Sequence, residues 1–186
     1  MLASSQLHLA TLVAALTTEQ LNLGLSSEQT AALTTAQVAS LTTRQISQGL
    51  RTDQLSVLTT DQVRALTTDH VAALESADAA ALTTKQISIL LTEQLAALVT
   101  DNLAALKTSQ IAALTTTQVA QGLTSDQVVA LTTQQVQQGL TTAQLAALTT
   151  ENLSALETVD FAVLKTNQIA ALTTTQVAQG LPTDQV

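Results

Sequence analysis

The sequence predicts an all-α solenoid, or superhelix, of very short helices, each about six residues long, built from repeats of eight or nine residues. A motif reading Leu-Thr-Thr-x-Gln-(Val/Ile/Leu)-x-Ala opens 21 times between Leu16 and Leu181, and self-similarity at a short fixed period is typical of solenoids. A hydroxyl residue stands at one fixed place in every repeat, and apolar residues recur three positions apart, as on one helix face. We therefore expect one continuous array over residues 16–186, the last repeat incomplete, with residues 1–15 as a degenerate N-terminal repeat or cap.

The start of each helix is predicted from the hydroxyl. Counting the leucine as the first position, the third position is Ser or Thr in all 21 repeats, whereas the second also accepts Arg51 and Pro182. A required hydroxyl with proline tolerated just before it predicts a helix N-cap. Asp or Glu at the fourth position of ten repeats agrees, because acids in a first turn interact favourably with the helix dipole. The predicted caps include Thr18, Thr35, Thr43, Thr60, Thr116, Thr133 and Thr174.

The body of each helix follows from the cap and is predicted to run through the eighth position into the next leucine. The sixth-position aliphatic residue and that leucine are three apart, as in Val38 and Leu41, so they share a buried face. The fifth-position glutamine flanks this face. We expect its side chain to hydrogen-bond to backbone groups at helix ends between layers.

Glycine is confined to the longer repeats. Five of the 20 steps between repeats are nine residues long, and the glycine is the additional residue. A glycine after the last helical residue predicts a helix end in the left-handed conformation, followed by a helix rotated relative to its neighbour. These glycines are Gly24, Gly49, Gly122, Gly139 and Gly180.

A β-solenoid is the alternative fold. Threonine and β-branched residues favour strands, and glutamine ladders occur in stacked sheets. Apolar spacings of five and three, rather than two, and the abundance of alanine in the second half of each repeat favour helices.

Composition limits the function classes. The formal charge is −8 and the six basic residues are scattered, which argues against a nucleic-acid partner. Without cysteine the chain has no disulfides and no thiolate chemistry. Residues 1–16 lack a basic segment and are too short for a membrane span, so we expect neither a signal peptide nor a span there. Because Val186 falls at the sixth position of a repeat, we expect a piece of a longer array.

No residue pattern predicts catalysis. His70 beside Asp69 could be a base with its carboxylate, but adjacent helical residues do not face each other, and His70 is interpreted as a polar replacement for glutamine. Repeats 74–78 and 156–160 carry acids around a hydroxyl, which leaves Ca²⁺ binding as an alternative to a capped helix start. Near-identical repeats do not bring dissimilar residues together, so we expect no enzyme, cofactor or metal.

The runs ALTTAQVASLTTRQI and ALTTTQVAQGLTSDQV resemble the Leu-Thr-Thr-x-Gln arrays of large bacterial exoproteins with adhesion or haem-utilisation labels. The resemblance implies a secreted or cell-surface location and brings no site residues. With the repeat pattern, it leads us to expect a structural rod or stalk. The alternatives are a solenoid that binds a peptide, a protein or another copy of the chain, and a threonine hydroxyl grid that binds ice or a glycan.

Overall fold

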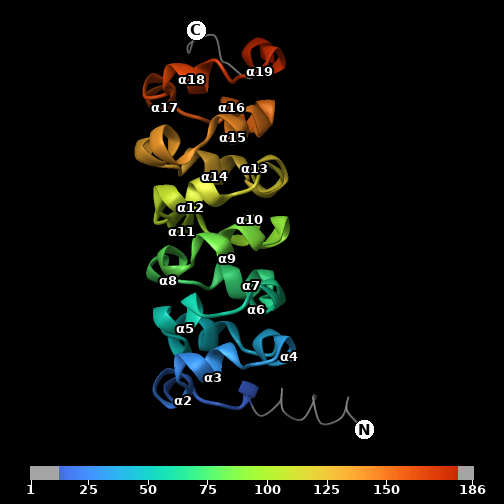
Figure 1. Ribbon diagram of the computed structural model, residues 1–186, viewed down its shortest axis with the longest axis vertical. Coiled ribbons are helices and arrows are strands. Elements are labelled where there is room, and N and C mark those ends of the chain that lie inside the picture. Colours follow the sequence, from blue (N-terminus) through green and yellow to red (C-terminus); the bar gives the residue numbers. More distant parts are fainter. Residues whose placement is uncertain (1–12, 180–186) are drawn as a thin grey trace. The chain divides into compact units, whose positions relative to one another are not determined.

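The computed structural model describes residues 13–179, and these form an all-α structure of short helices without any strand. Packing divides the chain into two compact halves, one ending at Leu90 and one beginning at Leu91. The N-terminal half contains α2 (Thr18–Gly24), α3 (Ser27–Ala31), α4 (Thr35–Ala39), the π-helical turn η1 (Gln45–Gly49), α5 (Thr52–Ser56), α6 (Thr60–Ala65), α7 (Thr68–Ala72), α8 (Ser76–Ala81) and α9 (Thr84–Ile89) (Figure 1).

The C-terminal half repeats the same plan. It contains α10 (Thr92–Ala97), α11 (Thr100–Ala104), α12 (Thr108–Ala113), α13 (Thr116–Gly122), α14 (Ser125–Val129), the π-helical turn η2 (Gln135–Gly139), α15 (Thr142–Ala147), α16 (Thr150–Ser154), α17 (Thr158–Ala162), α18 (Thr166–Ile169) and α19 (Thr174–Gln179). The all-α solenoid prediction is confirmed, and the β-solenoid alternative is not supported. The single continuous array over 16–186 stays a prediction, and most of the expected cap at residues 1–15 lies outside the described residues.

Three helices complete one turn within each half. In the N-terminal half α2 packs against η1, α4 against α6, and α6 against α9. In the C-terminal half α10 packs against α13, α12 against η2, and α15 against α18. The members of each pair are three helices apart along the chain, so in these pairs one helix lies on the helix one turn before it.

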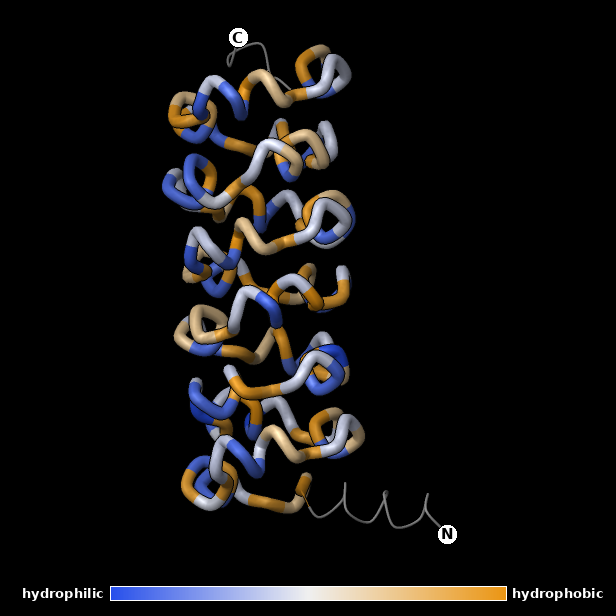
Figure 2. Tube along the Cα trace, viewed as in Figure 1, coloured by the Kyte–Doolittle hydropathy of each residue, from blue (hydrophilic) through white to orange (hydrophobic). Residues whose placement is uncertain are grey.

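The apolar positions form the core, as their spacing predicts. Every first-position leucine from Leu41 to Leu156 is buried, and Val38, three residues before Leu41, is fully buried. Hydrophobic segments alternate with hydrophilic ones along every turn of the trace (Figure 2). Because a six-residue helix is unstable alone, this shared core between turns is what holds each helix in place. No helix within residues 13–179 has the length and apolar character needed to cross a membrane.

The predicted cap register is wrong by one residue. The N-cap of α2 is Thr17, whose side chain accepts a hydrogen bond from the backbone N–H of Gln20. The Oε1 atom of Gln20 in turn accepts from the backbone N–H of Thr17 at 2.8 Å, which completes a capping box. Thr18 is the first helical residue instead.

The same correction applies to the other predicted caps. Thr35, Thr60, Thr116 and Thr174 each begin a helix. Thr43 and Thr133 likewise begin the helical segments that continue into η1 and η2. The hydroxyl bonded to the backbone N–H of the fifth-position glutamine belongs to the residue before each of them: Thr34, Thr42, Thr59, Thr115, Thr132 and Thr173. The physical reason is the glutamine, which must be the third helical residue to close the capping box.

The predicted left-handed glycines are also absent from the described residues, where no glycine has a positive φ. Gly180 lies outside those residues. Gly49 and Gly139 instead end the π-helical turns η1 and η2, which absorb the additional residue of their repeats. In η1 the backbone N–H of Leu50 donates to Gln45 O at 3.0 Å, five residues back.

Close packing between turns explains why three of these positions are glycine. A Cβ on Gly49 would lie 3.2 Å from Leu21 Cδ1, and one on Gly122 would lie 3.1 Å from Leu95 Cδ2. A Cβ on Gly139 would lie 3.0 Å from Ile111 Cβ. At Gly24 no atom lies within 4 Å of such a Cβ, so this glycine meets no comparable neighbour among the described residues.

Candidate functional site

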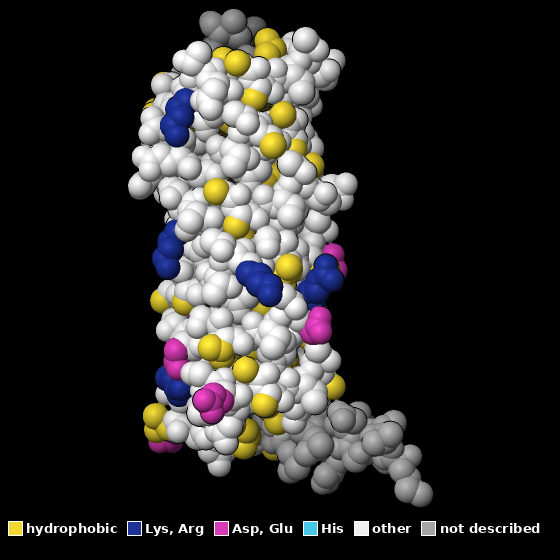
Figure 3. Space-filling model, viewed as in Figure 1, with side chains coloured by type: hydrophobic (Ala, Val, Ile, Leu, Met, Phe, Trp, Pro, Cys, Tyr) yellow, Lys and Arg dark blue, Asp and Glu magenta, His cyan; other side chains and the backbone are white. Residues whose placement is uncertain are grey.

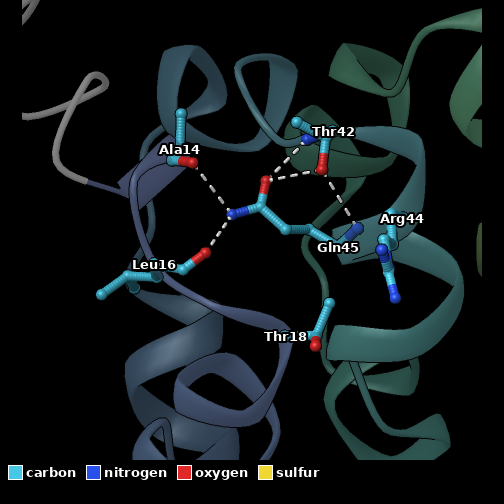
Figure 4. A pocket seen from close by; sticks show the side chains of 6 residues that line it. All are labelled: Ala14, Leu16, Thr18, Thr42, Arg44 and Gln45. Carbon is cyan, nitrogen blue, oxygen red and sulfur yellow. Dashed lines mark hydrogen bonds between the residues drawn. The ribbon is translucent and has the colours of Figure 1, made fainter.

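The most regular polar site is the fifth-position glutamine, which links one turn to the turn before it. In Gln45, Oε1 accepts from the backbone N–H of Thr42 at 2.7 Å, within its own repeat. Its Nε2 points the other way and donates to Leu16 O at 2.7 Å and Ala14 O at 3.1 Å (Figure 4). One buried amide therefore satisfies a helix start and the end of a helix one turn earlier.

This arrangement recurs in both halves and confirms the predicted role of glutamine. Gln86 Nε2 donates to Leu55 O and Leu58 O, both at 2.9 Å, and Gln144 Nε2 donates to Ile111 O and Leu114 O. The carbonyls are those of the sixth position and the next leucine, 28 to 33 residues back. The other glutamines with such bonds are Gln54, Gln62, Gln127, Gln135, Gln168 and Gln176.

His70 replaces glutamine with the same two bonds. Its Nδ1 accepts from the backbone N–H of Thr67 at 3.2 Å, and its Nε2 lies 2.6 Å from Leu41 O. Because a carbonyl oxygen only accepts, Nε2 carries the proton and Nδ1 does not, which assigns a neutral imidazole. The ring is 4% exposed and both nitrogens are engaged in structure, so Asp69 does not orient it. The interpretation as a glutamine replacement is confirmed.

Asp78 and Asp160 also occupy the fifth position, in the repeats with the alternative Ca²⁺ interpretation. Both are buried, and the backbone N–H of Glu75 or Glu157 hydrogen-bonds to the carboxyl group, as it would to a glutamine oxygen. Burial raises the pKa of Asp78 to about 6, and burial also raises the pKa of Asp160. The Oδ1 atom of Asp160 is buried and has no hydrogen-bond partner within residues 13–179.

Because the N-cap is the second-position residue, the third-position hydroxyls do not cap the helices. Ser27 Oγ donates to Asp53 Oδ2 at 2.8 Å, and Ser125 Oγ lies 3.1 Å from Asn152 Oδ1, so these two reach the following turn. Asp53 also pairs with Arg51, at 2.9 Å between Oδ1 and Nε, and the hydrogen bonds from Arg51 and Ser27 together lower the pKa of Asp53 to about 2. The third-position threonines are exposed or half-exposed.

Open grooves between turns and few charges mark the surface of the described residues. One groove, of about 270 Å³, is lined by residues 14–18 and 42–45, where Arg44 points away from Gln45 (Figure 4). Another, of about 400 Å³, lies at the equivalent place beside η2. On the face in view, charged side chains are few, and some of them lie beside a side chain of opposite charge (Figure 3). Within residues 13–179 no three His, Cys, Asp or Glu residues are grouped so as to hold a metal ion.

Sequence comparison identifies the repeat. A family model described as the ALTTAQ repeat matches residues 71–108, 92–121, 100–133 and 153–186, which together cover more than half of the chain. No curated protein matches the chain. The matched segments contain the same capping glutamines and buried leucines that build the turns in both halves. The chain belongs to the ALTTAQ-repeat family.

Proposed function

We propose that this chain is a structural spacer, a rod or stalk whose reach is set by its number of repeats, and that it is not an enzyme. The observation that carries the proposal is that the buried polar side chains hydrogen-bond to the backbone and so join neighbouring turns. Gln45, Gln86 and His70 each hydrogen-bond through the side chain to backbone groups of two turns. Such groups hold the turns together, and their hydrogen-bonding capacity is used for structure and not for catalysis.

Equivalent bonding between turns supports a spacer in a second way. Within each half the helices that pack on one another are three places apart, so the pattern contains no natural limit to its length. A binding groove, in contrast, needs dissimilar anchors concentrated on one face, such as aromatic or Arg side chains. The sequence has one Phe, no Trp and no Tyr.

Variants that differ by whole turns test the spacer directly. Three repeats, one full turn, are removed or duplicated, and the maximum dimension is measured by small-angle X-ray scattering. We expect the dimension to change by the same increment for each turn, at constant cross-section. A dimension that does not follow the number of turns contradicts the proposal.

We also propose a cell-surface or secreted location, which the resemblance to bacterial exoprotein arrays supports. Protease treatment of intact cells producing the natural protein, followed by detection of the array with an antibody, measures this. Complete protection in intact cells and cleavage after lysis would refute the location and leave the spacer proposal standing.

A hydroxyl-grid surface that binds ice or a glycan is the second candidate, because the third-position threonines do not cap helices. Thr35, Thr60 and Thr84 begin α4, α6 and α9, which pack on one another in successive turns, and so they form a line of hydroxyls. Ice binding predicts thermal hysteresis that is lost when these three threonines are replaced by Val. Absence of hysteresis at millimolar protein removes this candidate for ice.

A further inference from the structure

Two repeats replace a hydrogen-bond donor by an acceptor at the place where turns are joined. Asp78 and Asp160 are 5% and 2% exposed, respectively, at the position where other repeats carry glutamine. The amide of Gln86 donates to two carbonyl oxygens of the preceding turn, whereas an ionised carboxylate can only accept. Each half of the chain holds one of these acids.

The carbonyls that lose their donor follow from the repeat. Gln54 donates to Leu25 O, 29 residues back, and the equivalent oxygens are Leu50 O for Asp78 and Leu131 O for Asp160. In the part of the chain that the structure describes, no other group donates a hydrogen bond to Leu50 O or Leu131 O in place of the missing amide. Leu50 and Leu131 are both buried residues, and their unpaired carbonyls lie one turn before the two repeats that lack the amide. In one of these repeats Asp160 Oδ1 is also buried and has no partner among the described residues.

We propose that Asp78 and Asp160 are proton-binding sites that join the turns of the array. In the neutral acid, the O–H group donates to the leucine carbonyl of the preceding turn, in place of the glutamine amide. Loss of the proton leaves a buried carboxylate facing a carbonyl oxygen with no donor between them, which weakens the contact between turns. The array is therefore stabilised by acid at two defined places.

The electrostatic surroundings agree with this assignment. Burial is the first cause of the raised pKa at both acids, and the nearby charge of Glu75 or Glu157 adds to it. Among the described residues no basic side chain contributes to the pKa of Asp78 or Asp160, so no cation opposes the shift. The other titratable groups on the helices before, after and one turn below the two acids are Arg51, Asp53, Asp69, His70 and Lys85 around Asp78, and Asp126, Glu151 and Lys165 around Asp160.

The sign of the pH dependence follows. The folded chain keeps a proton on Asp78 up to about pH 6, whereas the unfolded chain releases it near 3.8. Stability from this site is thus fully present below about pH 4 and is lost as the pH rises through about 6. A shift of about two pKa units corresponds to about a 100-fold change in the folding equilibrium constant.

The test compares the full chain with Asp78→Gln, Asp160→Gln and the double variant, all in a His70→Gln background that removes the buried imidazole. Unfolding by urea is followed by circular dichroism from about pH 4 to about pH 8. We expect Asp78→Gln to raise the folding constant by about 100-fold at neutral pH and to change it little near pH 4. Asp69→Asn, at an exposed acid beside the same turn, is the matched control and should show no such pH-dependent difference.

Two results would overturn the proposal. Parallel pH profiles for the parent and both Asp→Gln variants would mean that neither acid binds a proton linked to folding. Stabilisation of the parent at neutral pH by added CaCl₂, but not of the double variant, would assign the site to a cation instead. A ¹³C titration of the Asp78 carboxyl group gives an independent readout, and a midpoint at its ordinary value of 3.8 would also refute the proposal.

Discussion

Replacing Gln86 by Ala removes one complete link between turns and gives the sharpest test of how the array is held together. The change deletes the acceptor for the backbone N–H of Thr83 and the donor to Leu58 O. Leu55 O loses the amide but keeps the bond from the backbone N–H of Leu58 at 3.2 Å. One fully buried carbonyl and one partly buried N–H are thus left without a protein partner.

These groups set the expected magnitude. An unsatisfied buried carbonyl costs about 1–3 kcal/mol, and the partly buried N–H costs about 1 kcal/mol. We therefore expect Gln86→Ala to lower the free energy of unfolding by about 3 kcal/mol and Tm by about 6–12 °C. The assay is urea and thermal unfolding followed by circular dichroism at 222 nm.

Two controls separate this cause from others. Gln86→Leu keeps the buried volume but not the hydrogen bonds, so most of the loss should remain. Gln134→Ala removes an exposed glutamine and should change stability by less than about 0.5 kcal/mol. If Gln86→Ala costs no more than Gln134→Ala, the links between turns do not stabilise the array and our reasoning fails.

Two further pairs of variants test the packing and the cap register. Gly139→Ala should lower the free energy of unfolding by about 1–3 kcal/mol, because its Cβ would lie 3.0 Å from Ile111, whereas Gly24→Ala should be neutral or raise it by up to about 1 kcal/mol in the same urea titration. Thr115→Ala should cost about 1 kcal/mol, since Thr115 Oγ1 accepts from a backbone N–H, whereas Thr116→Ala should stay within about 0.5 kcal/mol in thermal melts. Equal losses at the two threonines would contradict the cap assignment.

The regular features of the fold could be predicted from the sequence because they depend on spacing alone. A step of three from Val38 to Leu41 places both on one helix face, and both are buried. The invariant third-position hydroxyl, however, predicts an N-cap that is one residue too late in the chain. The spacing of Thr17 and Gln20, which is that of a capping box, indicates the correct register. This pattern is incomplete in repeats such as the one in which Arg51 stands in place of the hydroxyl residue.

Features that depend on how helices cross could not be predicted in this way. Three helices per turn result from the packing of α4 on α6 and of α6 on α9, and no local pattern encodes that number. The glycines illustrate the same limit. Gly139 is recognisable as a helix end in the sequence. The reason that a side chain would not fit there is Ile111, 28 residues earlier. Likewise, the sequence indicates only a helix-starting acid at Asp78, because its role depends on how its helix packs on the preceding turn.

The glutamine hydrogen bonds between turns are equivalent from repeat to repeat, and this affects how the number of repeats in the gene can change. A glutamine such as Gln86 needs a sixth-position carbonyl and a leucine carbonyl about one turn below it, and every repeat supplies this pair. Unequal recombination that inserts or deletes one whole repeat shifts each helix onto a new but equivalent neighbour, and the amides find carbonyls again. Copy number can therefore drift while the protein still folds, and natural selection on length can proceed in steps as small as eight codons.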